Sequence, residues 1–109
     1  MPHDEKKKET LGKPRIGLVP LEGIGICAGR VRGWAVETKY PDPDNWKDVD
    51  IQWYKDSFLR HWLAYQTDPK SINEESGLTH FDHACCTITF IAALEERRRQ
   101  YEETNHNRH

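Results

Sequence analysis

The chain has 109 residues, and 16 basic against 18 acidic side chains give it a formal net charge of −2 at pH 7. This length suits one domain with a modest core, and the balanced charge excludes the basic field that duplex nucleic acid requires, although local cations can still bind a small anion. Three cysteines make no disulfide framework, and neither a signal peptide nor a membrane-length apolar run is present. We therefore expect a cytoplasmic protein with no membrane partner.

The N-terminal part predicts a flexible arm followed by a helix. Residues 1–12 are charged and lack apolar periodicity, so burial cannot offset the entropy of ordering them. Pro20 suits a first helical position, and helical spacing continues from about Leu21 to Lys39 in the stripe Leu21, Ile24, Cys27 or Ala28, Val31 and Ala35. Glycines at positions 23, 25, 29 and 33 each cost roughly 1 kcal/mol against alanine. Such density predicts close approach of another backbone, or an irregular helix.

A loop and a second helix follow. The segment from Tyr40 to Trp46 is rich in proline, aspartate and asparagine, which is typical of a loop. Asp48 or Asp50 can cap a helix that runs through about Gln66. Its apolar stripe consists of Ile51, Tyr54, Phe58, Trp62 and Tyr65. Further apolar residues lie on its other sides, which predicts that another subunit covers them.

The last helix is expected from about Leu78 to Tyr101. Its apolar stripe consists of Leu78, Phe81, Cys85, Ile88 and Ala92. Residues 102–109 should fray, and no strand or internal repeat is evident. The sequence thus predicts an all-α fold, with three main helices in a small bundle over residues 13–101 that a homo-oligomer completes.

Acidic and histidine side chains gather around the start of this last helix. Glu74 and Glu75 precede it, and carboxylates are the ligands that Mg²⁺ or Mn²⁺ prefers. His80 and His83 lie on the side opposite the apolar stripe; alternatively, they are partly buried and bond loop carbonyls. The chain has no Cys-x-x-Cys and no His-Glu-x-x-His, so a zinc ribbon or zinc protease is not expected.

Two further groups allow both a structural and a functional interpretation. Asp56 and Arg60, four residues apart, form either a surface ion pair or a metal ligand beside a phosphate-binding guanidinium. The other group consists of Lys39, Tyr40, Asn45 and Trp46. Its members either fasten a loop and a helix end, or recognise a nucleotide through base stacking, base-edge hydrogen bonds and a phosphate contact. Composition alone does not choose between these alternatives.

Six short motifs in a fixed order connect these groups. They are Leu18-Val19-Pro20, Lys39-Tyr40, Asn45-Trp46, Arg60-His61, Glu75-Ser76-Gly77-Leu78 and His80-Phe81-Asp82-His83-Ala84. Over about residues 13–95 the chain resembles the small phage-associated family of dATP/dGTP diphosphohydrolase domains, which is akin to the all-α MazG-type nucleotide pyrophosphohydrolases. Asn73 departs from this pattern, in which an aspartate precedes the Glu-Ser-Gly element.

The resemblance implies a metal-dependent pyrophosphohydrolase that converts a purine deoxynucleoside triphosphate to its monophosphate and pyrophosphate, with Mg²⁺ or Mn²⁺ as cofactor. It implies catalytic and metal-binding roles for Asp56, Glu74 and Glu75. Contacts to the phosphates would come from Lys39, Arg60, His61, His80 and His83. Contacts to the nucleoside would come from Tyr40, Asn45 and Trp46. Two alternatives remain open: a phage protein that captures a host signalling nucleotide without hydrolysing it, and a helical assembly module.

Overall fold

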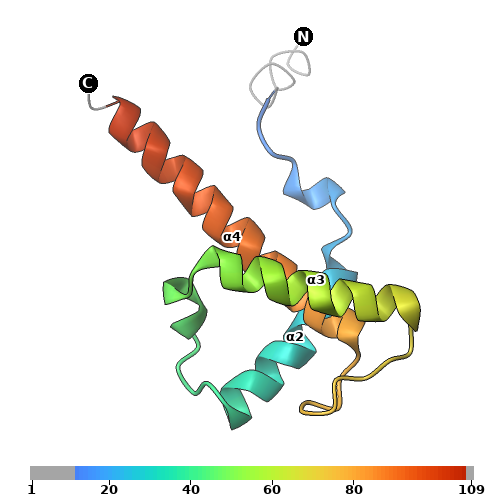
Figure 1. Cartoon of the computed structure of the whole chain (residues 1–109). Coiled ribbons are helices and arrows are strands. Elements are labelled where there is room, and N and C mark those ends of the chain that lie inside the picture. Colours follow the sequence, from blue (N-terminus) through green and yellow to red (C-terminus); the bar gives the residue numbers. More distant parts are fainter. Residues whose placement is uncertain (1–11, 108–109) are drawn as a thin grey trace.

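The computed structural model describes residues 12–107, which form an all-α fold (Figure 1). Its elements in chain order are η1 (Ile16–Leu18), α2 (Leu21–Thr38), η2 (Asn45–Asp48), α3 (Ile51–Thr67) and α4 (His80–Asn107). This range contains no strand, only an isolated bridge between Ile72 and Thr79. The predicted all-α class with three main helices is confirmed. The predicted flexible arm lies, except for Gly12, outside the described residues.

Local chemistry explains where the helices begin. α2 starts directly after Pro20, as expected. Asp50, one of the two predicted caps, precedes α3, and its Oδ1 accepts a hydrogen bond of 2.8 Å from the backbone N–H of Gln52. α4 begins at His80, not at Leu78, because the backbone of Leu78 accepts a bond of 2.8 Å from Asn73 N–H and so belongs to the preceding loop.

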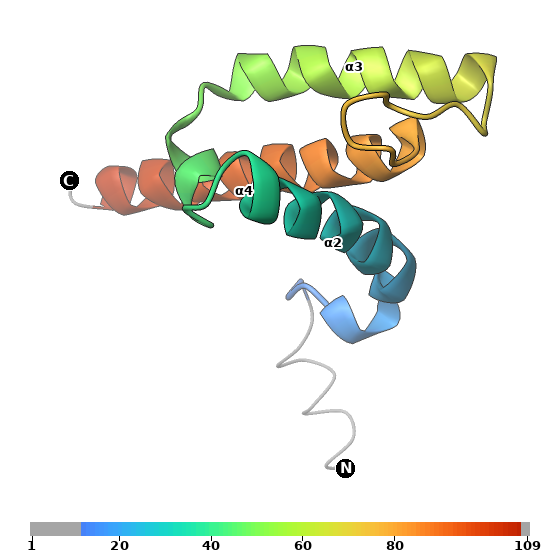
Figure 2. The same cartoon turned by 90° about the horizontal axis from the view of Figure 1, so that it is seen from below.

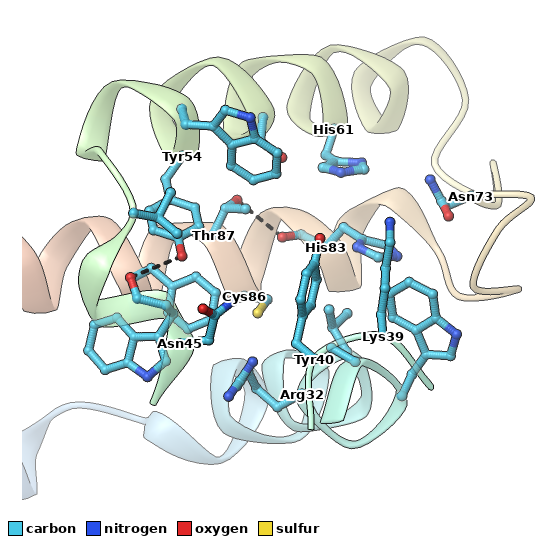
Figure 3. A pocket seen from close by; sticks show the side chains of 18 of the residues that line it. Arg32, Lys39, Tyr40, Asn45, Tyr54, His61, Asn73, His83, Cys86 and Thr87 are labelled. Carbon is cyan, nitrogen blue, oxygen red and sulfur yellow. Dashed lines mark hydrogen bonds between the residues drawn. The ribbon is translucent and has the colours of Figure 1, made fainter. Parts of the chain in front are cut away.

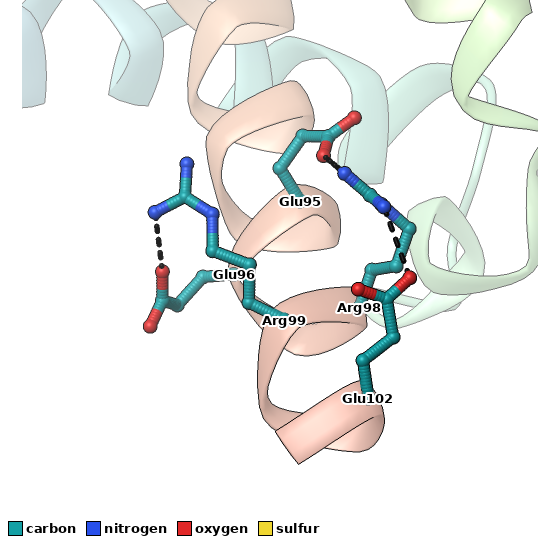
Figure 4. A network of polar contacts seen from close by, with 5 residues as sticks. All are labelled: Glu95, Glu96, Arg98, Arg99 and Glu102. Carbon is teal, nitrogen blue, oxygen red and sulfur yellow. Dashed lines mark hydrogen bonds and ion pairs between the residues drawn. The ribbon is translucent and has the colours of Figure 1, made fainter. Parts of the chain in front are cut away.

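α4 also extends beyond its predicted end at Tyr101 and remains helical as far as Asn107. Its last turns carry ion pairs at helical spacing, in which Arg98 contacts Glu95 and Glu102, and Arg99 contacts Glu96 (Figure 4). Such pairs stabilise a helix modestly, by roughly 0.2–0.5 kcal/mol each. Within residues 12–107, no helix has the length and hydropathy needed to cross a membrane.

α4 is the central element of the fold. α2 and α3 both pack against it, on different sides, but do not pack against each other (Figure 2). Because two helices cover α4, its residues 82–87 are all buried, including the polar Asp82, His83 and Thr87. The buried hydrophobic residues are Ala28, Val31, Ala35, Tyr54, Ala84, Cys85 and Cys86. This two-sided cover explains why apolar residues occur on more than one face of the last helix.

The glycine-rich face of α2 corrects one prediction. A Cβ atom built on any of its four glycines would meet no atom within 4 Å, and the helix is continuous from Leu21 to Thr38. The expected close approach of another backbone is therefore absent from the described chain, because all four glycines face away from α4 and are exposed. Large apolar side chains are also exposed, including Ile26, Leu59 and Leu63. The predicted homo-oligomer would cover such surface and stays a prediction.

Candidate functional site

The divergence of α2 and α3 leaves a cavity of about 630 Å³ between them, with α4 as its floor (Figure 3). This volume lies in the range of about 300–1,000 Å³ that is typical of small-molecule sites. The floor is formed by His83, Cys86, Thr87 and Phe90. Burial raises the pKa of Cys86 to about 11, so its thiol stays protonated and offers a small apolar surface, not a nucleophile.

One end of the cavity is aromatic. The rings of Trp46 and Phe90 are stacked, with centroids 5.1 Å apart and an interplanar angle of 11°, and the ring of Tyr54 lies 4.9 Å from Phe90. Burial raises the pKa of Tyr54 to about 12, so its hydroxyl remains a donor and bonds the backbone oxygen of Trp46 at 3.0 Å. Trp53 adds a further indole that lines the cavity and is 56% exposed.

Two arginines hold the loop between α2 and α3 at this aromatic end. Arg32 donates from Nη2 to the backbone oxygen of Pro43 at 2.9 Å, and its Cζ lies 5.3 Å from the centroid of the Phe90 ring. The guanidinium of Arg97 lies over Trp46, with Cζ 5.2 Å from that ring. Cations over aromatic faces are attracted by the ring quadrupole. The loop that carries Asn45 is thereby fixed beside the cavity (Figure 3).

The other end of the cavity carries cationic and histidine side chains. Lys39 caps the C-terminus of α2, and its Nζ lies 2.6 Å from Oε1 of Glu75 in the loop before α4. The hydrogen bond to Glu75 raises the pKa of Lys39, which is therefore fully charged at neutral pH. Arg60 and His61 line the cavity from α3, and His83 lines it from α4. Figure 3 shows Lys39, His61 and His83 at the end opposite Asn45.

Three histidines are in contact at this end. His61 and His80 face each other through their Nδ1 atoms at 2.8 Å, while the rings of His61 and His83 are stacked with centroids 4.7 Å apart. Burial, together with the neighbouring His83 and His80, lowers the pKa of His61 to about 4. Burial also lowers the pKa of His83. His61 is therefore neutral at pH 7 and serves as a hydrogen-bonding group there, not as a cation.

The loop before α4 positions His83. Its Nε2 lies 2.7 Å from Oγ of Ser76, and Oδ1 of Asn73 accepts hydrogen bonds from the backbone N–H of Ser76 at 3.0 Å and from its hydroxyl at 3.2 Å. Gly77 has a φ of 73°, which favours glycine. Asn73, the departure from the family pattern, thus closes a turn through its side-chain oxygen. An aspartate supplies the same acceptor.

The predicted site residues divide into two sets. Those that line the cavity together are Lys39, Tyr40, Asn45, Trp46, Arg60, His61, Glu75 and His83. Asp56, Glu74 and His80 are not among its lining residues. Asp56 is exposed on α3 and accepts a hydrogen bond of 3.0 Å from the side-chain amide of Gln52. His80 reaches the cavity only through its contact with His61.

The carboxylates do not fit a metal centre as they stand. Within residues 12–105, whose side chains the structure describes, no three histidine, cysteine, aspartate or glutamate side chains gather closely enough to hold a metal ion. Of the three predicted ligands, only Glu75 lines the cavity, and its carboxylate is paired with Lys39. A Mg²⁺ or Mn²⁺ ion bound by Asp56, Glu74 and Glu75 together would need a different arrangement of these side chains, and the metal stays a prediction.

Several lining residues escape the sequence argument. They include Arg32, Trp34, Asp50, Trp53, Tyr54, Ser57 and Phe90. Tyr54 sits in the predicted apolar stripe, where it is indistinguishable from a core residue. Arg32 carries a usable signal, because it is seven residues before Lys39 and so lies on the same face of the helix.

The sequence of the chain matches a known protein family. Neither a curated protein nor a solved structure matches the chain. The model of the family described as dATP/dGTP diphosphohydrolase, N-terminal, matches residues 3–104, which is nearly the whole chain. The chain therefore belongs to the dATP/dGTP diphosphohydrolase N-terminal family.

Proposed function

We propose that this chain binds a purine deoxynucleoside triphosphate in the cavity between α2 and α3 and converts it to the monophosphate and pyrophosphate. One observation carries the proposal: a single cavity of about 630 Å³ has the stacked rings of Trp46 and Phe90 at one end and Lys39 and the histidines at the other. Arg32 also lies at the aromatic end, and Trp34 and Tyr40 lie beside His83 and Lys39. A nucleotide has the same division, with a planar base at one end and a phosphate chain at the other. The family description supports the choice of dATP or dGTP.

The aromatic end offers the contacts that a base requires. Trp53 is exposed enough to stack on an incoming ring, whereas Trp46 already stacks on Phe90 and forms a fixed wall. Stacking of a base on an aromatic side chain is worth roughly 1–3 kcal/mol. The side-chain amide of Asn45 carries both a donor and an acceptor, which suits the edge of a purine.

The opposite end offers the contacts that phosphates require. Lys39 and Arg60 provide positive charge, and a guanidinium can bond two phosphate oxygens at once. The neutral His61 and His83 lie beside these cations, and a bound phosphate would favour their protonated forms. These four side chains come from the C-cap of α2, from α3 and from α4, so the triphosphate would bridge all three helices.

A second candidate function is capture of a nucleotide without hydrolysis. It is favoured by the absence of a metal-type cluster among the side chains of residues 12–105 and by the position of Asp56 outside the cavity. The groups that bind base and phosphate do not depend on a carboxylate cluster, so capture requires only the residues that already line the cavity. A host signalling nucleotide, such as a cyclic dinucleotide, is the ligand that this function predicts.

Tryptophan fluorescence tests whether the cavity binds a nucleotide. Trp34, Trp46 and Trp53 line it, whereas Trp62 contributes to a separate apolar pocket between α3 and α4. Titration with dATP or dGTP should quench the fluorescence of the wild-type protein and of Trp62→Phe to similar extents, and quenching should decrease in Trp53→Phe. Equal quenching in both variants, or none in the wild type, would contradict the proposed site.

Pyrophosphate release separates hydrolysis from capture. The wild-type protein is incubated with dATP or dGTP in the presence of Mg²⁺, Mn²⁺ or a chelator. Release that needs one of the metals supports the diphosphohydrolase and its predicted cofactor. Tight binding of a cyclic dinucleotide with no release from any triphosphate supports capture. Arg60→Ala should weaken nucleotide binding at least about tenfold in either case, because a charge-assisted hydrogen bond to phosphate is lost.

A further inference from the structure

One ion pair lies at the cationic end of the cavity, where the phosphate chain is proposed to bind. Nζ of Lys39 and Oε1 of Glu75 are 2.6 Å apart, and both side chains line the cavity. Their side chains remain accessible, with exposed fractions of 44% and 57%. Both partners can therefore be reached by a ligand without unfolding of the surrounding structure.

Pairing with a carboxylate distinguishes Lys39 from the other cationic side chains of the cavity. Of the basic side chains that line it in the described chain, Lys39 is paired with a carboxylate, whereas Arg32 donates to a backbone oxygen. No ion pair joins Arg60 to an acidic side chain within residues 12–107. An isolated surface ion pair contributes little to stability, typically 0–1 kcal/mol, so the fold does not require this pairing.

The backbone on either side of Glu75 is held in place. Asn73 donates from its backbone N–H to Leu78 O at 2.8 Å and accepts the Gly77 N–H at 2.8 Å, and Ser76 contacts His83 at 2.7 Å. The carboxylate of Glu75 therefore projects from a fixed turn toward the end of α2. Its position beside Lys39 follows from the same hydrogen bonds that orient His83.

We propose that Glu75 is an internal counterion that a phosphate chain displaces from Lys39, so that the site selects multiply charged phosphates over singly charged anions. This inference rests on the proposed nucleotide site. A singly charged anion gains no net charge attraction by replacing a carboxylate on Lys39. A triphosphate brings several negative charges and more acceptor oxygens, so the exchange favours it. Glu75 thus sets the selectivity of the site, while Lys39, Arg60 and the histidines supply its affinity.

Substitution of the carboxylate by its neutral isostere tests the inference. Calorimetric titrations with dATP, inorganic tripolyphosphate and deoxyadenosine are compared for the wild type, Glu75→Gln and Glu37→Gln. Glu37 is an exposed residue on α2 that does not line the cavity, and its removal changes the net charge equally. Glu75→Gln should tighten binding of dATP and tripolyphosphate by roughly two- to fivefold, as expected for one partly exposed competing charge. Its affinity for deoxyadenosine, and all three affinities of Glu37→Gln, should stay at the wild-type values.

A second background shows whether the effect passes through Lys39. In Lys39→Met the counterion has nothing to release, so adding Glu75→Gln should change the dATP affinity much less than it does in the wild type. If Glu75→Gln tightens dATP binding as much in Lys39→Met as in the wild type, Glu75 acts only by repelling the phosphates. That result would overturn the proposed displacement of Glu75 from Lys39. Weaker or unchanged dATP binding by Glu75→Gln, in a wild type that binds dATP, would overturn the inference and leave the nucleotide site standing. Failure of the wild type and of Glu75→Gln to bind either phosphate would overturn both.

Discussion

Protonation of His61 should destabilise the protein in mild acid. The pKa of this histidine lies near 4 in the folded chain against 6.5 for the free side chain, chiefly because burial disfavours the charged ring. Between these two pH values the unfolded state binds a proton that the folded state does not, so the free energy of unfolding decreases as the pH falls from 6.5 toward 4. Above pH 6.5 both states carry a neutral ring, and His61 contributes no pH dependence.

The structure sets the size of this effect. At about 1.36 kcal/mol per pH unit, the difference between 6.5 and about 4 gives a ceiling of about 3.4 kcal/mol. The ring is only half-buried and solvent can relax around it, so we expect about 1–2 kcal/mol. The contacts explain the sign: at 2.8 Å, the facing Nδ1 atoms of His61 and His80 share one proton, and a second proton would place two N–H groups against each other.

Urea denaturation at pH 7.5 and pH 4.5 measures the effect. The free energy of unfolding of the wild type should decrease between these pH values by about 1–2 kcal/mol more than that of His61→Gln, which keeps a polar side chain but cannot titrate. Carboxylates titrate equally in both proteins, so their contribution cancels in the comparison. Equal pH dependence in the two proteins would refute the reasoning. In the wild type, dATP should lessen the acid effect, because a phosphate beside the ring favours the imidazolium.

Three further substitutions test the fold and the loop. Gly29→Ala should raise the free energy of unfolding by about 0.5–1 kcal/mol, since the added Cβ meets no atom within 4 Å and alanine favours the helix. A loss of stability in urea denaturation, measured together with light scattering, would indicate that another copy of the chain covers this face. Asp82→Ala should cost about 1–3 kcal/mol, because the buried carboxylate pairs with Arg30 at 3.2 Å, and an unchanged urea midpoint would contradict that role. Asn73→Asp should leave the melting temperature nearly unchanged, because the turn needs only the side-chain oxygen; a large drop would show that the amide nitrogen matters.

The sequence predicts the helices well because their determinants are local. Pro20 and Asp50 mark helix starts, and the apolar spacing continues through each element. Within α2 the predicted stripe contains the buried Val31 and Ala35, although Leu21 at its start is 48% exposed. The last helix begins at His80, later than predicted, because a backbone hydrogen bond within the preceding loop, which no periodicity encodes, holds Leu78 outside it.

The site is only partly predictable, for a related reason. Motifs such as Lys39-Tyr40 and Asn45-Trp46 carry their resemblance to the family in the sequence, and both line the cavity. The acidic residues show the limit of this approach. Which face of α3 turns toward the cavity depends on its packing against α4, and this packing places Asp56 outside while burying Ser57 beside it. Asp56 and Ser57 are adjacent in sequence but lie outside and inside the cavity, and only the packed structure distinguishes them.

The separation of α2 from α3 has a consequence for how the molecule would respond to a ligand. Because α2 and α3 do not pack directly against each other (Figure 2), the width of the cavity is set by their separate contacts with α4 and with the loop between them. A tilt of either helix would therefore disturb only its contacts with α4 and with this loop. A ligand that contacts both α2 and α3 would connect the two helices directly. Amide hydrogen exchange would then slow in both α2 and α3 on binding, because the ligand supplies the contacts that these helices do not make with each other.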